Sequence, residues 1–250
     1  MDYSPYVYVT YGSKLGKYCA RWCRGSVDSD TEGEMMAELV PIPSPGVAAY
    51  YGAPGSPLIV LLHDWYGRLP WLEPYAAALA SQGYRVAVPD LYDGVATVDP
   101  ESAAALRDGL DTGAALATID ELVTEAHLEG STRVGLVGFS MGGWLALLHA
   151  QGGDADAVVA YYATLGTDEQ GLIPCAVLLN LAEDDEFDPG AEPESFVARL
   201  EDHGTPVTQF VYLGTGHSFA NASIPATLDN RAAALAFART ASFFGKQLVD

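Results

Sequence analysis

Apolar residues along the chain form short continuous runs, separated by segments with helical periodicity, from about residue 36 onward. Such runs are typical of strands buried on both faces of a parallel sheet, and the segments between them are typical of covering helices. The predicted strands are 58–62, 84–88, 133–139, 157–161, 176–181 and 207–213. The predicted helices are 70–81, 144–150, 193–202 and 227–244, and the segment 100–129 is predicted to be largely helical. This alternation predicts a single α/β domain with a mostly parallel central sheet and helices on both faces.

Ser140 stands at the junction between a predicted strand and a predicted helix, in Gly138-Phe139-Ser140-Met141-Gly142. At such a junction the G-x-S-x-G motif forces its middle residue into a strained conformation and leaves the hydroxyl exposed above the sheet edge. The glycines on either side leave room for the turn. A plain strand–helix turn would also explain the five letters. With strand, turn and helix all present, the motif predicts that Ser140 is a nucleophile.

His217 follows the last predicted strand, in the glycine-rich segment Gly214-Thr215-Gly216-His217-Ser218-Phe219. A serine hydroxyl becomes a good nucleophile only when a base takes its proton, and the base is nearly always a histidine oriented by a carboxylate. In folds of this kind the chain order is serine, acid, histidine. The order predicts that His217 is the general base, and a solvated loop histidine is the alternative.

An acidic run occupies the position expected for the orienting carboxylate. Strand 176–181 leads into Ala182-Glu183-Asp184-Asp185-Glu186-Phe187-Asp188-Pro189. We expect one of these carboxylates to orient the histidine and the others to form a solvated acidic turn. The run lacks the D-x-D-x-D-G ligand spacing of a calcium loop, so no metal site is expected here.

An oxyanion hole needs two backbone N–H groups aimed at the developing negative charge. One is expected from Met141, directly after the nucleophile. The other is expected from the loop that follows strand 58–62, which reads His63-Asp64-Trp65-Tyr66-Gly67. A purely structural role is the alternative for the two aromatic residues of this loop.

Together these motifs resemble the dienelactone hydrolase family of α/β-hydrolases. The loop 63–67 is similar to the family's His-Glu-Trp-Trp-Gly, Pro89-Asp90-Leu91-Tyr92 to its Pro-Asp-Leu-Tyr, and His217-Ser218-Phe219 to its His-x-Phe. The resemblance covers about residues 36–245 and implies an α/β-hydrolase fold without a lid domain. It also implies Asp185 as the acid of the triad, with Asp184 as the runner-up, and Trp65 as the second oxyanion donor.

The resemblance gives further residues a place near the substrate. The acid of the family's early loop, usually a glutamate that contacts the nucleophile, falls on Asp64, and Tyr66 and Asn221 are expected to contact the substrate or support the site. Two departures matter: the enzymes named for dienelactone have a cysteine where Ser140 stands, and an arginine that grips the substrate carboxylate where Asn221 stands. Both disfavour dienelactone itself as the substrate. Arg107 is an alternative source of positive charge.

The sequence therefore predicts a serine hydrolase that cleaves carboxylic esters or lactones of small molecules through an acyl-enzyme, with no metal or organic cofactor. A thioesterase or peptidase with the same triad is the first alternative. The second alternative is a non-catalytic member of the fold that binds a small molecule. The ordered Ser, Asp and His argue against the latter, because a binding module has no need of all three.

The charge and composition of the chain limit the kinds of partner that it is expected to bind. The chain of 250 residues has 33 acidic and 12 basic residues, a net charge of −21, which argues against nucleic acid or an anionic membrane as a partner and is compatible with a salt-adapted source. No signal peptide or membrane span is expected, so a cytoplasmic location is predicted. The protein is expected to be a monomer or a homodimer. Three cysteines do not make a disulfide framework. Residues 1–34 are expected to be a partly ordered extension, or to precede the true start, with 35–250 as the hydrolase domain.

Overall fold

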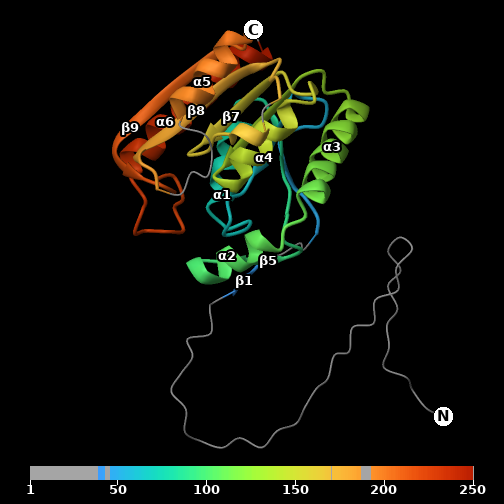
Figure 1. Cartoon of the computed structure of the whole chain (residues 1–250). Helices are drawn as coiled ribbons and strands as arrows, with labels where there is room; N and C mark the ends of the chain where they lie inside the picture. Colours follow the sequence, from blue (N-terminus) through green and yellow to red (C-terminus); the bar gives the residue numbers. More distant parts are fainter. Residues whose placement is uncertain (1–38, 43–45, 170, 187–192, 250) are drawn as a thin grey trace, which may run out of the picture. The chain divides into compact units, whose positions relative to one another are not determined.

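A seven-stranded sheet forms the centre of the domain (Figure 1). The computed structural model describes residues 39–42, 46–169, 171–186 and 193–249, so the predictions for residues 1–34 lie outside the described residues. The strand order is β2-β4-β3-β6-β7-β8-β9; β2 pairs antiparallel with β4, and every other pair is parallel. The strands are β2 (Ala49–Tyr51), β3 (Leu58–Leu62), β4 (Arg85–Val88), β6 (Val134–Phe139), β7 (Ala157–Tyr161), β8 (Ala176–Asp184) and β9 (Val207–Gly216). A separate two-stranded sheet pairs β1 (Leu39–Pro41) with β5 (Val95–Thr97).

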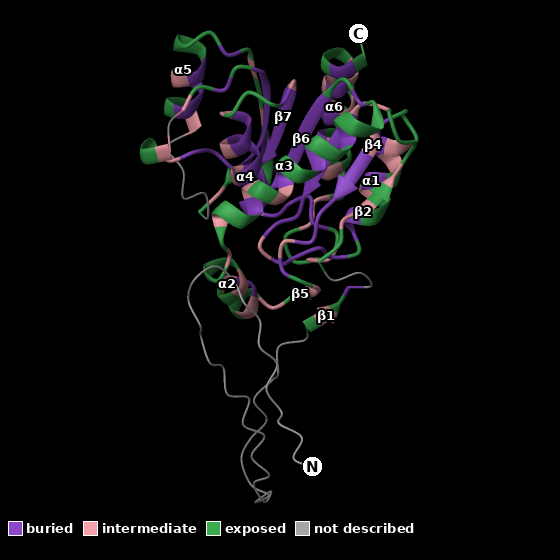
Figure 2. Ribbon diagram, turned by 90° about the vertical axis from the view of Figure 1, so that its right-hand side faces the viewer, coloured by how far each residue is buried: buried purple, intermediate pink, exposed green. Residues whose placement is uncertain are grey.

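Helices cover both faces of the sheet, as predicted. The helices are α1 (Leu72–Ala80), α2 (Pro100–Asp108), α3 (Thr112–Glu129), α4 (Met141–Ala150), α5 (Pro193–Asp202) and α6 (Asn230–Phe244), followed by a π-helical turn (Gly245–Val249); a 3-10 turn (Thr167–Glu169) precedes β8. One apolar cluster joins α3, α4 and α5 to one face of the sheet, and a second joins α1 and α6 to the other. Figure 2 shows the buried strands between helices whose outer sides are exposed. Residues Ala37–Asp250 cluster as one compact unit.

For β3, β7 and α5, the first and last residues are the same as those predicted. The segment 100–129, predicted to be largely helical, forms two helices. Asp99 caps the start of α2 by accepting from Ser102 N, and Asp111 caps the start of α3 by accepting from Ala114 N. A second cap inside one apolar segment starts a new helix, because it satisfies the free N–H groups of a new first turn.

Three short strands, β1, β2 and β5, were not predicted. Each has three residues, too few for a period of two to stand out, and β1 and β2 have no fully buried position. Among the described helices, none is both long and apolar enough to cross a membrane.

Candidate active site

Ser140 occupies a sharp turn between β6 and α4 with φ of 51° and ψ of −118°, outside the regions that residues other than glycine normally adopt. Neighbouring glycines permit this turn. A Cβ on Gly138 would lie 2.0 Å from the carbonyl oxygen of Gly142, and one on Gly142 would lie 2.3 Å from the carbonyl oxygen of His63. The start of α4 therefore lies directly against the end of β3 and the loop that follows it.

The Ser140 side chain makes no capping bond at the start of α4, although serine is among the preferred N-cap residues. Its Oγ instead lies 2.7 Å from Nε2 of His217. The backbone N–H of Ser140 donates to the carbonyl of Tyr161, which fixes the turn to the neighbouring strand β7. The strained turn thus presents the hydroxyl to the imidazole rather than to the helix.

His217 comes directly after β9, the edge strand, and its ring is mostly shielded from solvent. Nδ1 lies 2.8 Å from Oδ1 and 3.0 Å from Oδ2 of Asp185. A carboxylate only accepts hydrogen bonds, so Nδ1 carries a proton and donates it in a hydrogen bond to Asp185. Nε2 is then unprotonated and accepts the hydrogen bond of the Ser140 hydroxyl. The structure brings these three predicted residues together in the order and geometry that acyl transfer requires.

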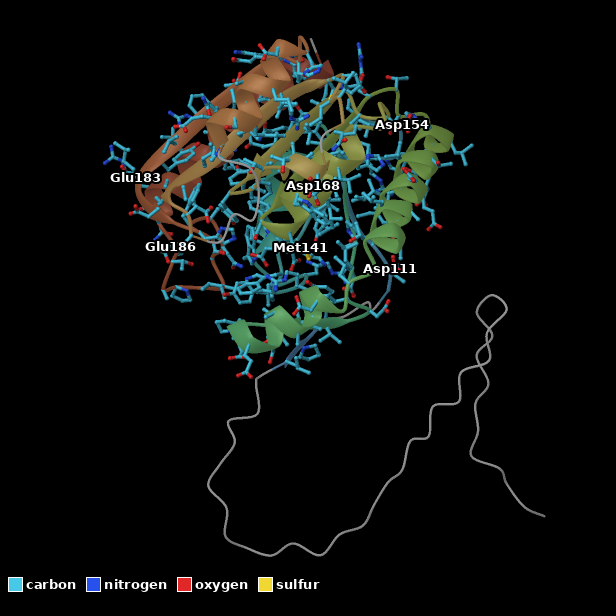
Figure 3. All side chains as sticks on the ribbon, viewed as in Figure 1. Asp111, Met141, Asp154, Asp168, Glu183 and Glu186 are labelled. Atoms are coloured by element: carbon cyan, nitrogen blue, oxygen red, sulfur yellow. The ribbon has the colours of Figure 1, made fainter. Side chains whose placement is uncertain are left out.

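The acidic run resolves into different roles at neighbouring positions. Asp185 faces His217, and its side chain is 12% exposed. Asp184, the runner-up, is an exposed residue that ends β8 opposite Gly216, and Glu183 accepts the backbone N–H of Gly214. Glu186, labelled in Figure 3, is also exposed. Asp188 lies outside the described residues.

The two predicted oxyanion donors, Met141 and Trp65, belong to segments that lie against each other beside Ser140. Met141, which is labelled in Figure 3, is the first residue of α4. The first N–H groups of a helix have no partner within the helix. Its thioether sulfur accepts the Tyr92 hydroxyl at 3.1 Å, which ties it to the loop after β4. Trp65 lies two residues beyond His63, whose carbonyl abuts Gly142. The structure thus places the loop of one predicted donor against the helix that carries the other.

His63 supports this loop as a buried, neutral ring. Its Nδ1 donates to the carbonyl of Asp64 at 2.7 Å, and its Nε2 accepts the backbone N–H of Leu91 at 3.1 Å. An imidazole with one donor and one acceptor nitrogen is uncharged. Burial, which disfavours the charged form, lowers the pKa of His63 to about 4.

Asp64 and Asn221 form a fully buried hydrogen bond between two loops that are far apart in sequence. Nδ2 of Asn221 donates to Oδ2 of Asp64 at 2.7 Å, and neither residue is exposed. The other carboxylate oxygen, Oδ1, accepts the backbone N–H of Tyr66 at 3.0 Å. Burial raises the pKa of Asp64 to about 6, against the smaller lowering effects of the Tyr66 and Asn221 hydrogen bonds and of the nearby His217.

Tyr66, predicted as a possible substrate contact, takes part in the internal structure of this loop. Its ring packs edge-on against Trp65 at 5.3 Å, its carbonyl accepts the N–H of Thr97, and its side chain is buried. Asn221 likewise directs its amide to Asp64 rather than to an open cavity. Asn221 stands where the family pattern has an arginine that binds the substrate carboxylate. Its side chain is uncharged, and its amide is hydrogen-bonded to a buried residue of the protein itself.

Arg107 brings positive charge to the same side of the molecule. Its guanidinium carbon lies 5.6 Å from the centre of the Trp65 ring, and the group also forms an ion pair of 2.8 Å with the neighbouring Asp108. The pair partly offsets the charge. Among the described residues no group of three or more His, Cys, Asp or Glu could hold a metal ion.

The sequence reasoning missed Tyr162. This residue follows β7 with φ of 39°, and its ring centre lies 4.9 Å from that of His217. Its hydroxyl is buried and has no hydrogen-bond partner among the residues that the structure describes. A tyrosine directly after a buried strand gives no signal in sequence that separates packing from function.

Comparisons with known proteins point to one family. The model of the dienelactone hydrolase family matches residues 46–248. A protein of Azospirillum brasilense, named provisionally as a carboxymethylenebutenolidase, is 32% identical over 219 residues, which cover 81% of this chain and 92% of that protein. The carboxymethylenebutenolidase of Pseudomonas putida is 30% identical over 214 residues, covering 78% and 89%. A provisionally assigned dienelactone hydrolase of Klebsiella pneumoniae, 22% identical, shares the fold with a TM-score of 0.69 and covers 84% of this chain and 98% of its own. Because the family model spans both the sheet and all the site residues described above, the chain belongs to the dienelactone hydrolase family and has the α/β-hydrolase fold.

Proposed function

We propose that the protein cleaves carboxylic ester or lactone bonds of small molecules through an acyl-enzyme formed on Ser140. The observation that supports this most directly is the strained Ser140, whose Oγ lies 2.7 Å from Nε2 of His217 instead of capping its helix. A strained non-glycine residue at a turn persists only where the surrounding structure holds it, and such strain is concentrated at active sites.

In the proposed first half-reaction, Oγ of Ser140 attacks the carbonyl carbon of the ester while its proton passes to Nε2 of His217. The backbone N–H groups of Met141 and Trp65 hold the negative oxygen of the tetrahedral intermediate, an interaction typically worth about 10²–10³ in rate for each donor. The C–O bond to the alcohol then breaks, and the proton on Nε2 goes to the leaving alkoxide. The Ser140 ester of the acid remains.

In the second half-reaction, water gives a proton to Nε2 of His217 and attacks the acyl carbon. The tetrahedral intermediate collapses, the carboxylic acid leaves, and the proton returns to Oγ of Ser140. Asp185 keeps the Nδ1–H proton in place through both steps and stabilises the imidazolium that forms in each. For a lactone, the alcohol and the acid stay on one molecule, and the steps are the same.

The proposed substrates are neutral esters and lactones rather than carboxylated lactones. Asn221 provides no positive charge and donates to the buried Asp64. Arg107 shares its charge with Asp108 at 2.8 Å. Neither Asn221 nor the paired Arg107 would therefore supply an uncompensated positive charge to a substrate carboxylate.

Hydrolysis of short-chain p-nitrophenyl esters by the wild type and by Ser140→Ala tests the proposal. We expect loss of about 10³-fold or more in kcat for the variant, with the folded structure retained, because a triad member is removed. Equal rates would refute the mechanism. Mass spectrometry of the wild type treated with a phosphonate ester should locate a covalent adduct on the peptide that contains Ser140. Comparing a dienelactone with a neutral lactone tests the substrate class, and a strong preference for the carboxylated compound would contradict it.

A further inference from the structure

We propose that Asn221 and Asp64 form a positioning pair that holds the loop carrying the Trp65 oxyanion donor in register with the loop carrying His217. This inference rests on the proposed function, because it assigns a role to two residues that would not touch the substrate. The hydrogen bond between them joins positions 157 residues apart in sequence, and both side chains are fully buried.

On one side of the bond, Asp64 determines the backbone around Trp65. The residue directly precedes Trp65, and its Oδ1 accepts the backbone N–H of Tyr66, which directly follows. A side-chain bond across two residues of this kind fixes the peptide groups between them. Moving the Asp64 carboxylate would therefore rotate or shift the Trp65 N–H.

On the other side, Asn221 is fixed within the loop of His217. Its backbone N–H donates to the carbonyl of Ser218, and its Oδ1 accepts the backbone N–H of Ser223 at 2.8 Å. Because Oδ1 must face a donor there, Nδ2 faces Asp64, and the orientation of the amide is determined by its partners. Ser218, next to the histidine, has φ of 65°, so the turn that carries the imidazole is itself strained.

The two loops thus meet at a buried hydrogen bond, and the other described hydrogen bonds of its two side chains lie within their own loops. A carboxylate and an amide bonded in a dry interior have few alternative arrangements, because any unpaired buried polar group carries a large desolvation cost. The pair would hold the distance between the oxyanion donor and the base. A displacement of about 1 Å between such groups is enough to lower a rate by about 10².

The chain offers a sharp test, because exchanging the two residues preserves every bond. In the double variant Asp64→Asn, Asn221→Asp, Oδ1 of residue 64 still accepts the Tyr66 N–H and its Nδ2 donates to residue 221. The carboxylate at 221 accepts both that bond and the Ser223 N–H. Either single substitution breaks the pattern: Asp64→Asn sets two amide donors against each other, and Asn221→Asp sets two carboxylates against each other.

We expect both single variants and Asn221→Ala to lower kcat for p-nitrophenyl acetate by about 10²-fold with KM changed less than about threefold. The exchanged double variant should recover at least about tenfold of that loss. Thr205→Val is the matched control: it removes a buried hydroxyl that donates to the carbonyl of Ile173, at the amino ends of the strands and away from the site. Its Tm should fall while its kcat stays within about twofold of the wild type.

Two results would overturn the positioning role. One is Asn221→Ala with kcat within threefold of the wild type, and the other is a double variant no faster than the slower single variant. Should the single variants fail to fold, the double variant still decides, because a folded but slow double variant contradicts the proposal. Ser140→Ala, measured beside them, separates the two hypotheses. If Ser140→Ala loses activity while the Asp64 and Asn221 variants keep theirs, the positioning role is refuted and the proposed function stands.

Discussion

Replacing Gly142 by alanine tests whether the close approach of α4 to β3 sets up the active site. A Cβ at this position would lie 2.3 Å from the carbonyl oxygen of His63 and 2.6 Å from that of Leu62. Carbon–oxygen contacts are seldom closer than about 3.3 Å, so the start of α4 and the end of β3 must separate by about 1 Å. The obstructing atoms are backbone atoms, which cannot turn aside as a side chain would.

That separation affects both stability and chemistry. Overpacking of this kind costs about 1–3 kcal/mol, and we take about 3 kcal/mol because backbone opposes backbone. The better helix propensity of alanine returns about 1 kcal/mol. The net loss of about 2 kcal/mol corresponds to a fall in Tm of roughly 4–8 °C for a domain of this size. The same shift moves the Met141 N–H away from the loop of Trp65, and a misplacement of about 1 Å can lower the rate about 10²-fold.

The measurements are Tm by differential scanning calorimetry and kcat/KM for p-nitrophenyl acetate. Gly109→Ala is the matched control. Gly109 ends α2 with φ of −85°, which any residue adopts, and a Cβ there would lie 3.5 Å from the nearest atom. The control should keep its activity and lose no stability. Gly142→Ala with kcat/KM within about threefold of the wild type would show that the contact does not position the site.

Two further predictions concern buried groups beside the triad. Burial raises the pKa of Asp64 from 3.8 to about 6. Between these pH values the native state holds a proton that the unfolded chain has released. As the pH rises through this range, Asp64 therefore lowers the free energy of unfolding of the protein by about 3 kcal/mol. The free energy of unfolding, measured by urea denaturation from pH 4 to 7, should therefore fall for the wild type relative to Asp64→Asn as the pH rises. A difference between the two proteins that does not change with pH would contradict the raised pKa. Tyr162→Phe removes a buried hydroxyl that has no partner among the described residues and should stabilise the protein by about 1 kcal/mol; a lower Tm would mean that the hydroxyl is bonded.

The fold and the Ser140 turn could be predicted because their signals are local. Buried parallel strands are continuous apolar runs, and the glycines beside Ser140 are required by contacts within one strand–turn–helix unit. The positions of the caps were equally local, since Asp99 and Asp111 each precede a helical segment. The division of the largely helical segment 100–129 into two helices was not predicted, although Gly109 at the end of α2 and the Asp111 cap of α3 are local signals of it.

The choice among the acids could not be made from local signals. Five carboxylates stand within six positions, and in a regular strand successive side chains alternate between faces. The pairing of β8 with β9 is irregular between Ala182 and Asp184, where the register shifts. Such a bulge changes the direction of the residues that follow it, and it is here that Asp185, rather than Asp184, faces His217. The resemblance to the family selected Asp185, whereas spacing alone left the acids undecided.

The hydrogen bond between Asp64 and Asn221 bears on the proposal that Ser140 is the nucleophile. In the family, the early-loop acid contacts the nucleophile, which in the enzymes named for dienelactone is a cysteine. Here both oxygens of Asp64 are occupied, one by the Asn221 amide and one by the Tyr66 N–H, and the Ser140 hydroxyl bonds to His217 instead. A hydroxyl needs a base that takes its proton as it attacks, and the imidazole, with its proton on Nδ1 held by Asp185, can do so. In the proposed mechanism Asn221 thus has two effects: it gives the substrate no counter-charge, and it binds Asp64 away from Ser140. The two departures from the family pattern therefore support one another.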